Sequence, residues 1–377
     1  MKRLFCAICE NNIINNIFIL NNMPISLYCT DVNKNFEYNE LSFSQCNYCN
    51  TIQLDKLIDL NKLYEKSHNF TSVGNIWHNY FKLFVEKIQK LTNNKIVLEI
   101  GDGSGKIALN INNYSSWYIV EPNKNPNVNF NKNKNIYFIE KFFDETFNID
   151  KKIDIIVHSH LFEHIYEPNI FIRKCYEVLN ENGEMFFGVP NMSYLADNIT
   201  PFLGIFFEHT IFLNKENIEY LLEKNNFKLI EIIDYEKHST IYHCIKLPIN
   251  NNIFCERKTQ KFLNYYDTFM NTLSNFKIFI KECNDIISTT NKSVYIFGAS
   301  YNTQIIINLG LNINNIKGIL DNCKEKQNKY LYGINLNIYD PSVIENEECI
   351  IILKNGYYIN EIIEQLHHLN NNVQIIN

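Results

Sequence analysis

Glycine and proline are scarce in this chain of 377 residues, which contains 12 glycines and 8 prolines. These counts exclude collagen-like and proline-rich linker architectures. A basic block is also absent, because 35 basic residues are spread among 41 acidic ones and the formal net charge is −6. Proteins that bind nucleic acids neutralise phosphates with clustered Lys and Arg side chains. We therefore expect no nucleic-acid partner.

Long apolar runs are missing as well. No run reaches 18 residues, so we expect no membrane-spanning helix. The basic start of the chain is followed by an apolar stretch that Glu10, Asn11 and Asn12 interrupt. A signal peptide needs an unbroken apolar segment, and we therefore expect a cytoplasmic protein. Its eleven cysteines are then not a disulfide framework, because the cytosol keeps thiols reduced.

The composition that remains is that of a globular protein, with 46% apolar and 20% charged residues. From Lys95 onward, short apolar runs alternate with amphipathic stretches, and an Asn-rich break separates two such blocks. The runs are IVLEI (96–100), WYIV (117–120), IYFI (136–139), DIIVHS (154–159), EMFFGV (184–189), KLIEII (228–233), SVYIFGA (293–299), IKGILD (316–321), CIIIL (349–353) and VQII (373–376). This alternation is typical of α/β domains, in which crossover helices connect parallel strands.

Four segments follow from these patterns. We expect a cysteine-bearing module at 1–60, a complete α/β domain at 61–250, a helical linker at 251–290 and a smaller α/β domain at 291–377.

Two C-x2-C pairs lie in the first segment. Cys6 and Cys9 form one pair, and Cys46 and Cys49 form the other. Four thiolates complete a tetrahedral Zn2+ site with no open position, so the metal would be structural. A segment this short has little core of its own, which gives the metal a stabilising role. The alternative is chance clustering in a chain with many cysteines.

A glycine-rich turn follows the first strand of the large domain. Gly101, Gly103 and Gly105 give the spacing G-x-G-x-G, whereas the dinucleotide fingerprint is G-x-G-x-x-G. Glu99, just before the turn, fits poorly beside a pyrophosphate. It fits well near the ammonium and sulfonium groups of S-adenosylmethionine. We therefore predict a strand, a glycine turn and a helix that bind this cofactor.

Two further acidic residues follow later strands. Glu121 lies 22 residues after Glu99 and ends the next strand. An acidic side chain there can accept hydrogen bonds from both ribose hydroxyls; the alternative is a solvated strand end. Phe142, Phe143 and Asp144 follow the third strand and are candidates to surround the adenine, although the two aromatic rings are equally compatible with ordinary core packing.

The order of these motifs resembles that of class I S-adenosylmethionine-dependent methyltransferases. VLEIGDGSG is similar to their first motif, Glu121-Pro122 to their ribose contact and LFEHIYEP to their fourth-strand motif. The whole chain resembles the three-domain sugar C-methyltransferases that act on nucleotide-linked keto-deoxysugars. The carrying segments are CAIC, MPISLY and LSFSQCNYCNTIQL near the N-terminus, and FGASYNT, KQNKYLYGINLNI and NGYYINEI near the C-terminus. The resemblance implies a class I Rossmann-like domain between a zinc-binding domain and a C-terminal Rossmann-like domain without a dinucleotide.

The resemblance also implies a catalytic segment with the pattern Tyr-His-Glu-His. Here the pattern is Phe206-Phe207-Glu208-His209, so the last two residues match and the first two are phenylalanine. His209 is the candidate general base, with Glu208 as its orienting partner, because histidine has the right pKa range to remove a proton next to a ketone. His164 and His68 are further candidates. For each histidine the alternative is a core or surface role, and packing is the favoured role of Phe206 and Phe207.

Three function classes remain open at this point. The first is C-methylation of a nucleotide-linked sugar, the second is O- or N-methylation of a surface-glycan precursor, and the third is a non-catalytic protein that retains the fold. The intact glycine turn and Glu121 argue against the third class. In the last domain, Phe297-Gly298-Ala299-Ser300 has one glycine where a pyrophosphate loop needs several. We therefore expect no dinucleotide there, although Asp321 ends the second strand, and we expect this domain to close over the acceptor.

Overall fold

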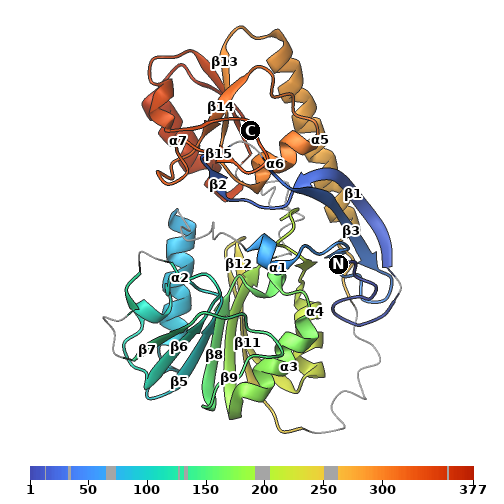
Figure 1. The fold of residues 1–377 in the computed structure, drawn as a ribbon, viewed down its shortest axis with the longest axis vertical. Helices are drawn as coiled ribbons and strands as arrows, with labels where there is room; N and C mark the ends of the chain where they lie inside the picture. The colour runs from blue at the N-terminus through green and yellow to red at the C-terminus, as the bar shows by residue number, and fades with distance from the viewer. Residues whose placement is uncertain are drawn as a thin grey trace.

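A computed structural model describes residues 1–12, 14–32, 35–64, 74–125, 128–130, 135–191, 204–249, 262–354 and 356–377. Two α/β lobes are stacked along the long axis, and an N-terminal hairpin runs beside both of them (Figure 1). The lower lobe contains the large sheet, and the upper lobe contains the C-terminal sheet. His68 and the segment around it lie outside the described residues.

The large sheet has seven strands in the order β11-β12-β9-β8-β5-β6-β7. Five of them are parallel to one another, and β11 and β12 are antiparallel additions at one edge. Their bounds are β5 (Ile96–Ile100), β6 (Ser116–Val120), β7 (Ile136–Ile139), β8 (Ile153–Ser159), β9 (Leu179–Pro190), β11 (Phe227–Tyr235) and β12 (Ser239–Lys246). Each strand predicted between residues 96 and 233 is present, and the carboxyl ends of the parallel strands share one edge, where ligands of open α/β sheets bind.

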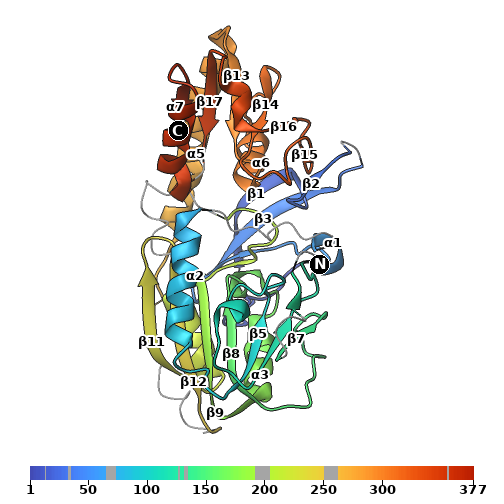
Figure 2. The ribbon, with the colours of Figure 1, turned by 90° about the vertical axis from the view of Figure 1, so that its left-hand side faces the viewer.

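Helices cover both faces of this sheet. Helix α2 (Asn75–Ile88) buries Tyr80, Phe84 and Ile88, which follow one another at four-residue steps and share one helix face. On the other face, α3 (Pro168–Val178) and α4 (Lys215–Lys224) pack against each other. Figure 2 shows α2 running along the sheet toward the C-terminal lobe, and Asn75 Nδ2 donates a hydrogen bond to Glu361 Oε1 of that lobe at 3.3 Å.

The C-terminal sheet has five parallel strands in the order β16-β14-β13-β17-β18. The strands are β13 (Ser293–Phe297), β14 (Ile316–Leu320), β16 (Ile338–Tyr339), β17 (Cys349–Leu353) and β18 (Gln374–Ile376), and the helices are α5 (Tyr266–Thr289), α6 (Tyr301–Asn308) and α7 (Ile359–Leu369). Most of the expected linker at 251–290 is α5, which buries an apolar face in the same core as this sheet. The helix is therefore a structural part of the lobe.

The N-terminal segment shares sheets with both lobes. Strands β1 (Ile14–Pro24), β3 (Tyr38–Cys46) and β4 (Ile52–Leu54) form one sheet, whose fourth strand is β10 (Ile211–Phe212) of the lower lobe. In addition, β2 (Cys29–Thr30) pairs with β15 (Tyr330–Leu331) of the upper lobe. The short α1 (Leu60–Leu63) ends this segment. Residues 1–60 therefore connect the two α/β lobes through backbone hydrogen bonds.

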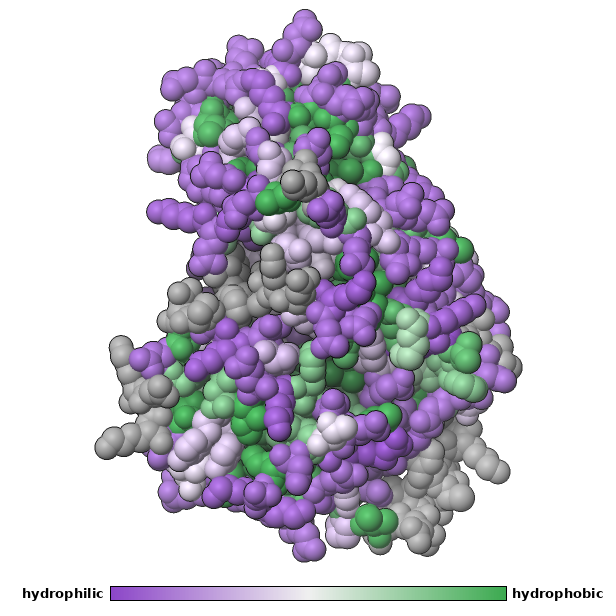
Figure 3. Space-filling view, viewed as in Figure 1, coloured by the Kyte–Doolittle hydropathy of each residue, from purple (hydrophilic) through white to green (hydrophobic). Residues whose placement is uncertain are grey.

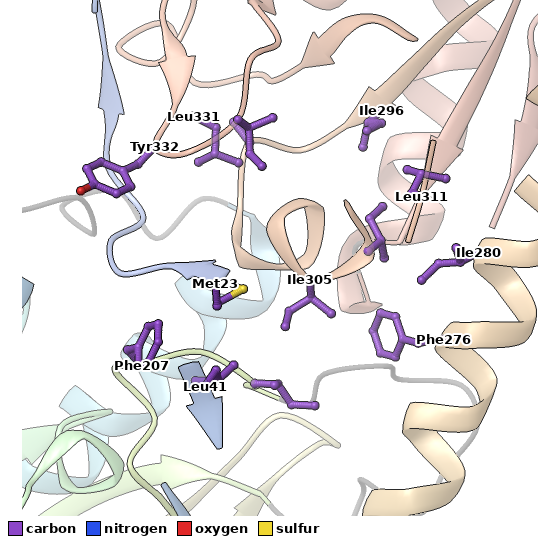
Figure 4. Packing of buried hydrophobic residues seen from close by; sticks show 14 of the residues in the cluster. Met23, Leu41, Phe207, Phe276, Ile280, Ile296, Ile305, Leu311, Leu331 and Tyr332 are labelled. Atoms are coloured by element: carbon purple, nitrogen blue, oxygen red, sulfur yellow. The ribbon is translucent and has the colours of Figure 1, made fainter. Parts of the chain in front are cut away.

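One hydrophobic core extends across these boundaries. It combines Met23 and Leu41 of the hairpin with Phe276 of α5, Ile305 of α6 and Phe207 of the segment that precedes β10. Figure 4 shows these side chains facing one another from elements far apart in the sequence. Burial of apolar surface stabilises the folded state by about 25 cal/mol per Å². This shared core therefore stabilises the contact between the hairpin and the C-terminal lobe.

One face of the molecule is mainly polar. On the face seen in Figure 3, hydrophilic side chains cover most of both lobes, and hydrophobic ones form small scattered groups. Within the described residues, no helix combines the length and the apolar character needed to span a membrane.

Candidate active site

The glycine turn leaves β5 with backbone angles that favour glycine. Gly101 has φ +86° and Gly105 has φ +64°. A Cβ atom would lie 2.9 Å from Leu161 Cδ1 at the first position and 2.4 Å from Phe130 Cε1 at the second. Asp102 closes the turn, because its carboxylate accepts hydrogen bonds from Ser104 N at 2.8 Å and Lys106 N at 2.6 Å. These glycines let the chain turn tightly at the edge where a cofactor would bind.

The turn is not followed by the helix that we predicted. It leads instead into a single 3₁₀ turn at Ala108–Asn110. β6 starts at Ser116, so few residues are available for a crossover. Asn110 Nδ2 donates a hydrogen bond to the Lys106 carbonyl at 2.7 Å, and such local side-chain bonds compete with helix formation.

Glu121 lies directly beside this turn. Its Oε1 accepts a hydrogen bond from Asn123 N at 2.9 Å, and Asn125 N donates to the Gly103 carbonyl at 3.0 Å. Burial raises the pKa of Glu121 to about 7, and the nearby charge of Asp102 contributes to this shift. A half-buried carboxylate in this position gains from hydroxyl donors, which fits the predicted ribose contact.

Glu99 is completely buried beneath the turn. Its Oε2 accepts a hydrogen bond from the Trp117 indole Nε1 at 2.7 Å, and its Oε1 has no hydrogen-bond partner among the described residues. Burial raises the pKa of Glu99 well above its usual value, and Asp102 adds to this effect. In the structure Glu99 therefore connects β5 to β6, and its contact with a cofactor stays a prediction.

Asp144 and Phe143 have local partners. The Asp144 carboxylate is exposed and accepts hydrogen bonds from Thr146 N at 2.8 Å and Thr146 Oγ1 at 2.6 Å. The Phe143 ring packs against Phe147 and Phe171, at centroid distances of 5.0 and 5.5 Å. Phe143 is therefore a core residue in the structure, and an adenine contact by Asp144 stays a prediction.

Two of the predicted histidines meet at the carboxyl edge of the sheet. His164 ends a 3₁₀ turn (Phe162–His164) just after β8, and His209 lies just before β10. Their ring centroids are 4.9 Å apart and their planes are nearly perpendicular, at 87°. Burial lowers the pKa of His209 well below its usual value, and the charge of His164 adds to this shift. The imidazole of His209 is therefore unprotonated at neutral pH, which is the form in which a general base acts.

Two carboxylates and a phenol surround His164. Glu208 Oε2 lies 3.9 Å from His164 Nδ1, and Glu163 Oε1 lies 3.8 Å from His164 Nε2. The Tyr64 hydroxyl forms a hydrogen bond with His164 Nδ1 at 3.3 Å. We expected Glu208 to orient His209, and the structure brings its carboxylate to His164. Sequence reasoning did not identify Glu163, although an acidic residue beside a histidine in an apolar turn is a usable signal.

The two phenylalanines of the catalytic segment are packing residues, as expected. Phe207 is buried in the core shared with the hairpin. Phe206 stacks on Tyr301 of α6, with centroids 4.8 Å apart and an interplanar angle of 18°, and it also contacts the His209 ring. The catalytic segment therefore contacts the C-terminal lobe directly.

A third histidine lies nearby in a hydrogen-bonded chain that the sequence did not reveal. His160 Nδ1 pairs with Ser159 Oγ at 3.0 Å and His160 Nε2 with Ser239 Oγ at 2.9 Å. Ser239 Oγ continues to His238 Nδ1 at 2.5 Å, and Ser159 Oγ to the Tyr80 hydroxyl at 2.8 Å. Both ring nitrogens of His160 are thus engaged in the structure.

The four predicted zinc ligands come together in space. Sγ atoms lie 3.4 Å apart in the pair Cys6 and Cys49 and 3.5 Å apart in the pair Cys9 and Cys46, and all four lie within 4.8 Å of one another. A tetrahedron with Zn–S bonds of about 2.3 Å has sulfur–sulfur edges of about 3.8 Å. The donor set and its spacing therefore fit a closed zinc site, which stays a prediction.

The cysteine module also supports the catalytic segment. Strand β4 pairs with β10, which follows His209 directly. The buried Arg3 guanidinium donates from Nη1 to the Thr210 carbonyl at 2.8 Å and from Nη2 to the Tyr166 carbonyl at 2.6 Å. Thr210 N in turn donates to the Glu163 carbonyl at 2.9 Å. These bonds fix the position of His209 relative to His164.

The first turn of the C-terminal sheet is closed by its own side chains. Asp321 Oδ2 accepts a hydrogen bond from Ala299 N at 2.8 Å, and Lys326 Nζ lies 3.4 Å from the same oxygen. In a dinucleotide site, the Asp321 carboxylate would bind the ribose and the turn at Ala299 would face the pyrophosphate. Here the two bind each other. This arrangement is consistent with the expectation that this lobe binds no dinucleotide.

Comparisons with known families match two parts of the chain. Residues 76–232 match the family described as "Methyltransferase domain", and residues 252–376 match the "C-methyltransferase C-terminal domain". None of the curated proteins matches the chain.

Solved structures include several similar chains. N-methyltransferase NodS from Bradyrhizobium japonicum WM9, in complex with S-adenosyl-l-homocysteine, is 10% identical with a TM-score of 0.37, over 46% of this chain and 89% of its own. A SAM-dependent methyltransferase from Aquifex aeolicus is 15% identical with a TM-score of 0.35, over 43% of this chain and 89% of its own.

Proposed function

Because its residues 76–232 form a methyltransferase domain with a class I Rossmann-like fold, this chain is an S-adenosylmethionine-dependent methyltransferase, and we propose that it methylates a carbon atom of a nucleotide-linked keto-deoxysugar. One observation carries the proposal: the buried His209 lies beside His164 at the carboxyl edge of the sheet. The match of residues 252–376 to a C-methyltransferase domain supports a carbon acceptor.

A carbon acceptor makes specific demands on the protein. S-adenosylmethionine supplies an activated methyl group, so the chain mainly has to align the acceptor behind it. Gly101, Gly103, Gly105 and Glu121 would hold the cofactor along the glycine turn. A carbon next to a ketone must also lose a proton, and His209 is the proposed base because burial keeps its imidazole neutral.

The other groups of the site would support this chemistry. The proposed zinc, held by Cys6, Cys9, Cys46 and Cys49, is structural, because four thiolates leave no coordination position for a substrate. The C-terminal lobe would contact the nucleotide half of the acceptor. We also propose that the enzyme acts in the cytoplasm, where thiols stay reduced.

The alternative function is O- or N-methylation of a surface-glycan precursor. The observation that favours it is the pair Phe206 and Phe207, which are buried where the sugar C-methyltransferases have tyrosine and histidine. An oxygen acceptor also benefits from a base but requires no carbon acid. A non-catalytic role is the third possibility, which the match to two methyltransferase families disfavours.

Proton exchange distinguishes these functions. The full chain is incubated in heavy water with nucleotide-linked keto-sugars, with and without S-adenosylmethionine, and NMR follows the proton next to the ketone. We expect exchange with the wild type and its loss with His209→Asn, which cannot titrate. General bases contribute about 10²–10⁴-fold.

Each other result has a defined meaning. Equal exchange by the variant moves the role of base to His164 or His68. Absence of exchange in the wild type, together with an O- or N-methyl product, overturns the proposal in favour of the alternative.

A further inference from the structure

Glu163 is a buried carboxyl group that the proposed chemistry has not yet used. Its side chain is 4% exposed, and neither of its oxygens has a hydrogen-bond partner among the described residues. Buried polar groups are nearly always paired, so an orphaned carboxyl group in a site needs an explanation. Two basic side chains lie close to it. His164 Nε2 is 3.8 Å from Glu163 Oε1, and a ring nitrogen of His209 lies within 4.8 Å of both Glu163 and His164.

The position of Glu163 is fixed by the backbone. It lies in the middle of the 3₁₀ turn that follows β8, and its carbonyl accepts the hydrogen bond from Thr210 N. The turn and the catalytic segment therefore move together, which keeps the carboxyl group beside His164.

The two histidines have different neighbours, although a Glu163 oxygen lies within 4.8 Å of a ring nitrogen of each. His164 has a carboxylate within 3.9 Å of each ring nitrogen, Glu163 on one side and Glu208 on the other. His209 has a Phe206 ring against it at 4.4 Å. The other titratable groups that face His164 are the Tyr64 hydroxyl, the His209 ring and, through a longer electrostatic interaction, His160. When the environments of two neighbouring titratable groups push their pKa values apart, one group serves as acid and the other as base.

We propose that Glu163 is a positioning residue whose titration is coupled electrostatically to that of His164 across 3.8 Å, so that the two together hold one proton and act as the acid of the site, with His209 as its base. This inference rests on the proposed function for its substrate. His209 takes the proton from the carbon while the pair donates its proton to the ketone oxygen, which gives an enol. On methyl transfer, the carbon–carbon bond forms, the carbon–sulfur bond breaks and the enol proton returns to the pair. His209 then releases its proton to water.

Burial also acts on Glu163 directly and raises its pKa to about 8. A proton therefore remains on the pair through neutral pH. When the proton lies on His164, Glu163 is the carboxylate that stabilises the imidazolium. Without that carboxylate, His164 should release its proton at a lower pH.

The test does not require the acceptor. In the full chain with ¹⁵N-labelled histidine, NMR follows the titration of the His164 ring, which is assigned by comparison with His164→Asn. We expect the Glu163→Gln variant to lower the His164 midpoint by at least about one pH unit, the usual size of such a charge effect. Glu163→Asp should largely restore it.

Glu167→Gln is the matched control. Glu167 is exposed and lies four residues further along the same segment, as the N-cap of α3, so its removal should leave the His164 midpoint unchanged. Thermal unfolding of each variant shows that the fold is retained. An unchanged midpoint in folded Glu163→Gln overturns the inference, because a purely structural carboxyl group would not alter this titration.

Turnover gives a second measurement. With an accepted substrate, the high-pH limb of the kcat profile should shift to lower pH in Glu163→Gln, whereas KM for S-adenosylmethionine should not change. A shifted midpoint without any C-methyl product means that the proposed substrate is wrong and the role of Glu163 stands. A C-methyl product with an unshifted midpoint means that the proposed substrate is right and the role of Glu163 is wrong.

Discussion

Single residues at the cofactor edge have effects that follow from their hydrogen bonds. Glu121 lies beside the glycine turn with a carboxylate that one backbone donor partly satisfies. Its raised pKa, about 7, means that it gains a proton as the pH falls below neutrality. A protonated carboxyl group is a weaker acceptor for ribose hydroxyls than the carboxylate is.

The first prediction concerns this residue. Glu121→Ala should weaken S-adenosylmethionine binding by at least about tenfold in calorimetry, since each hydrogen bond to a charged acceptor contributes about 1.5–3 kcal/mol. Wild-type affinity should also fall between pH 8 and pH 6, and the variant should lack that dependence. Equal affinity of both proteins would place the cofactor elsewhere.

Gly204 gives the second prediction at this scale. It has φ +52°, and a Cβ atom there would lie 2.1 Å from His209 Nδ1. Gly204→Ala should therefore displace the proposed base and lower kcat by at least tenfold, while calorimetry shows unchanged S-adenosylmethionine affinity. Gly310→Ala is a suitable control, because it also has a positive φ but no atom within 4 Å of the added carbon. If both variants have wild-type kcat, His209 is not the base.

At the scale of elements, the pairing of β4 with β10 connects the cysteine module to chemistry. Strand β4 follows the second cysteine pair after a few residues, and β10 follows His209. The proposed metal would therefore act at a distance, by holding the strand that pairs with β10. Metal binding to such a site contributes directly to folding.

The third prediction follows from this connection. Elemental analysis of the purified protein should find one zinc per chain. Its removal by a chelator, or Cys46→Ser, should lower the melting temperature and the turnover together, whereas Cys29→Ser should change neither. A metal-free protein with full stability and activity would contradict the site.

For the whole molecule, the important contact is that between the catalytic segment and the C-terminal lobe. Phe206 stacks on Tyr301 across this boundary, and the shared core adds Phe207 from the same segment. The two lobes and the hairpin therefore set the position of the catalytic segment together.

The fourth prediction tests this arrangement. Tyr301→Ala should raise KM for the acceptor about three- to tenfold, because a stacked aromatic pair contributes about 0.5–1.5 kcal/mol. Affinity for S-adenosylmethionine should not change, since the glycine turn follows β5 of the large sheet whereas Tyr301 belongs to α6 of the C-terminal lobe. An unchanged KM would mean that the C-terminal lobe does not position the acceptor.

Patterns along the chain were sufficient to predict most of the large sheet and the turn at its cofactor edge, whereas the roles of the site residues stay predictions. Strands are short and local, so the apolar runs identified six of the seven strands of the large sheet, all except β12. The C-x2-C spacing identified four thiols that the fold does bring together. The glycine turn was also recognised, because its backbone angles restrict the residue type. The helix expected after it was wrong, because the hydrogen bond from Asn110 and the nearby start of β6 depend on the folded loop.

Only the tertiary structure decided which groups are partners. Glu208 is adjacent to His209 in the sequence, yet its carboxylate lies beside His164, and Glu163 joins the same cluster from a different element. Likewise, residues 1–60 read as a separate module, although their strands pair with β10 and β15, at positions more than 150 residues away. Sequence patterns report periodicity and spacing along a few turns of chain, whereas charge pairing, proton affinity and interlobe packing depend on distances through space, which the completed fold alone sets.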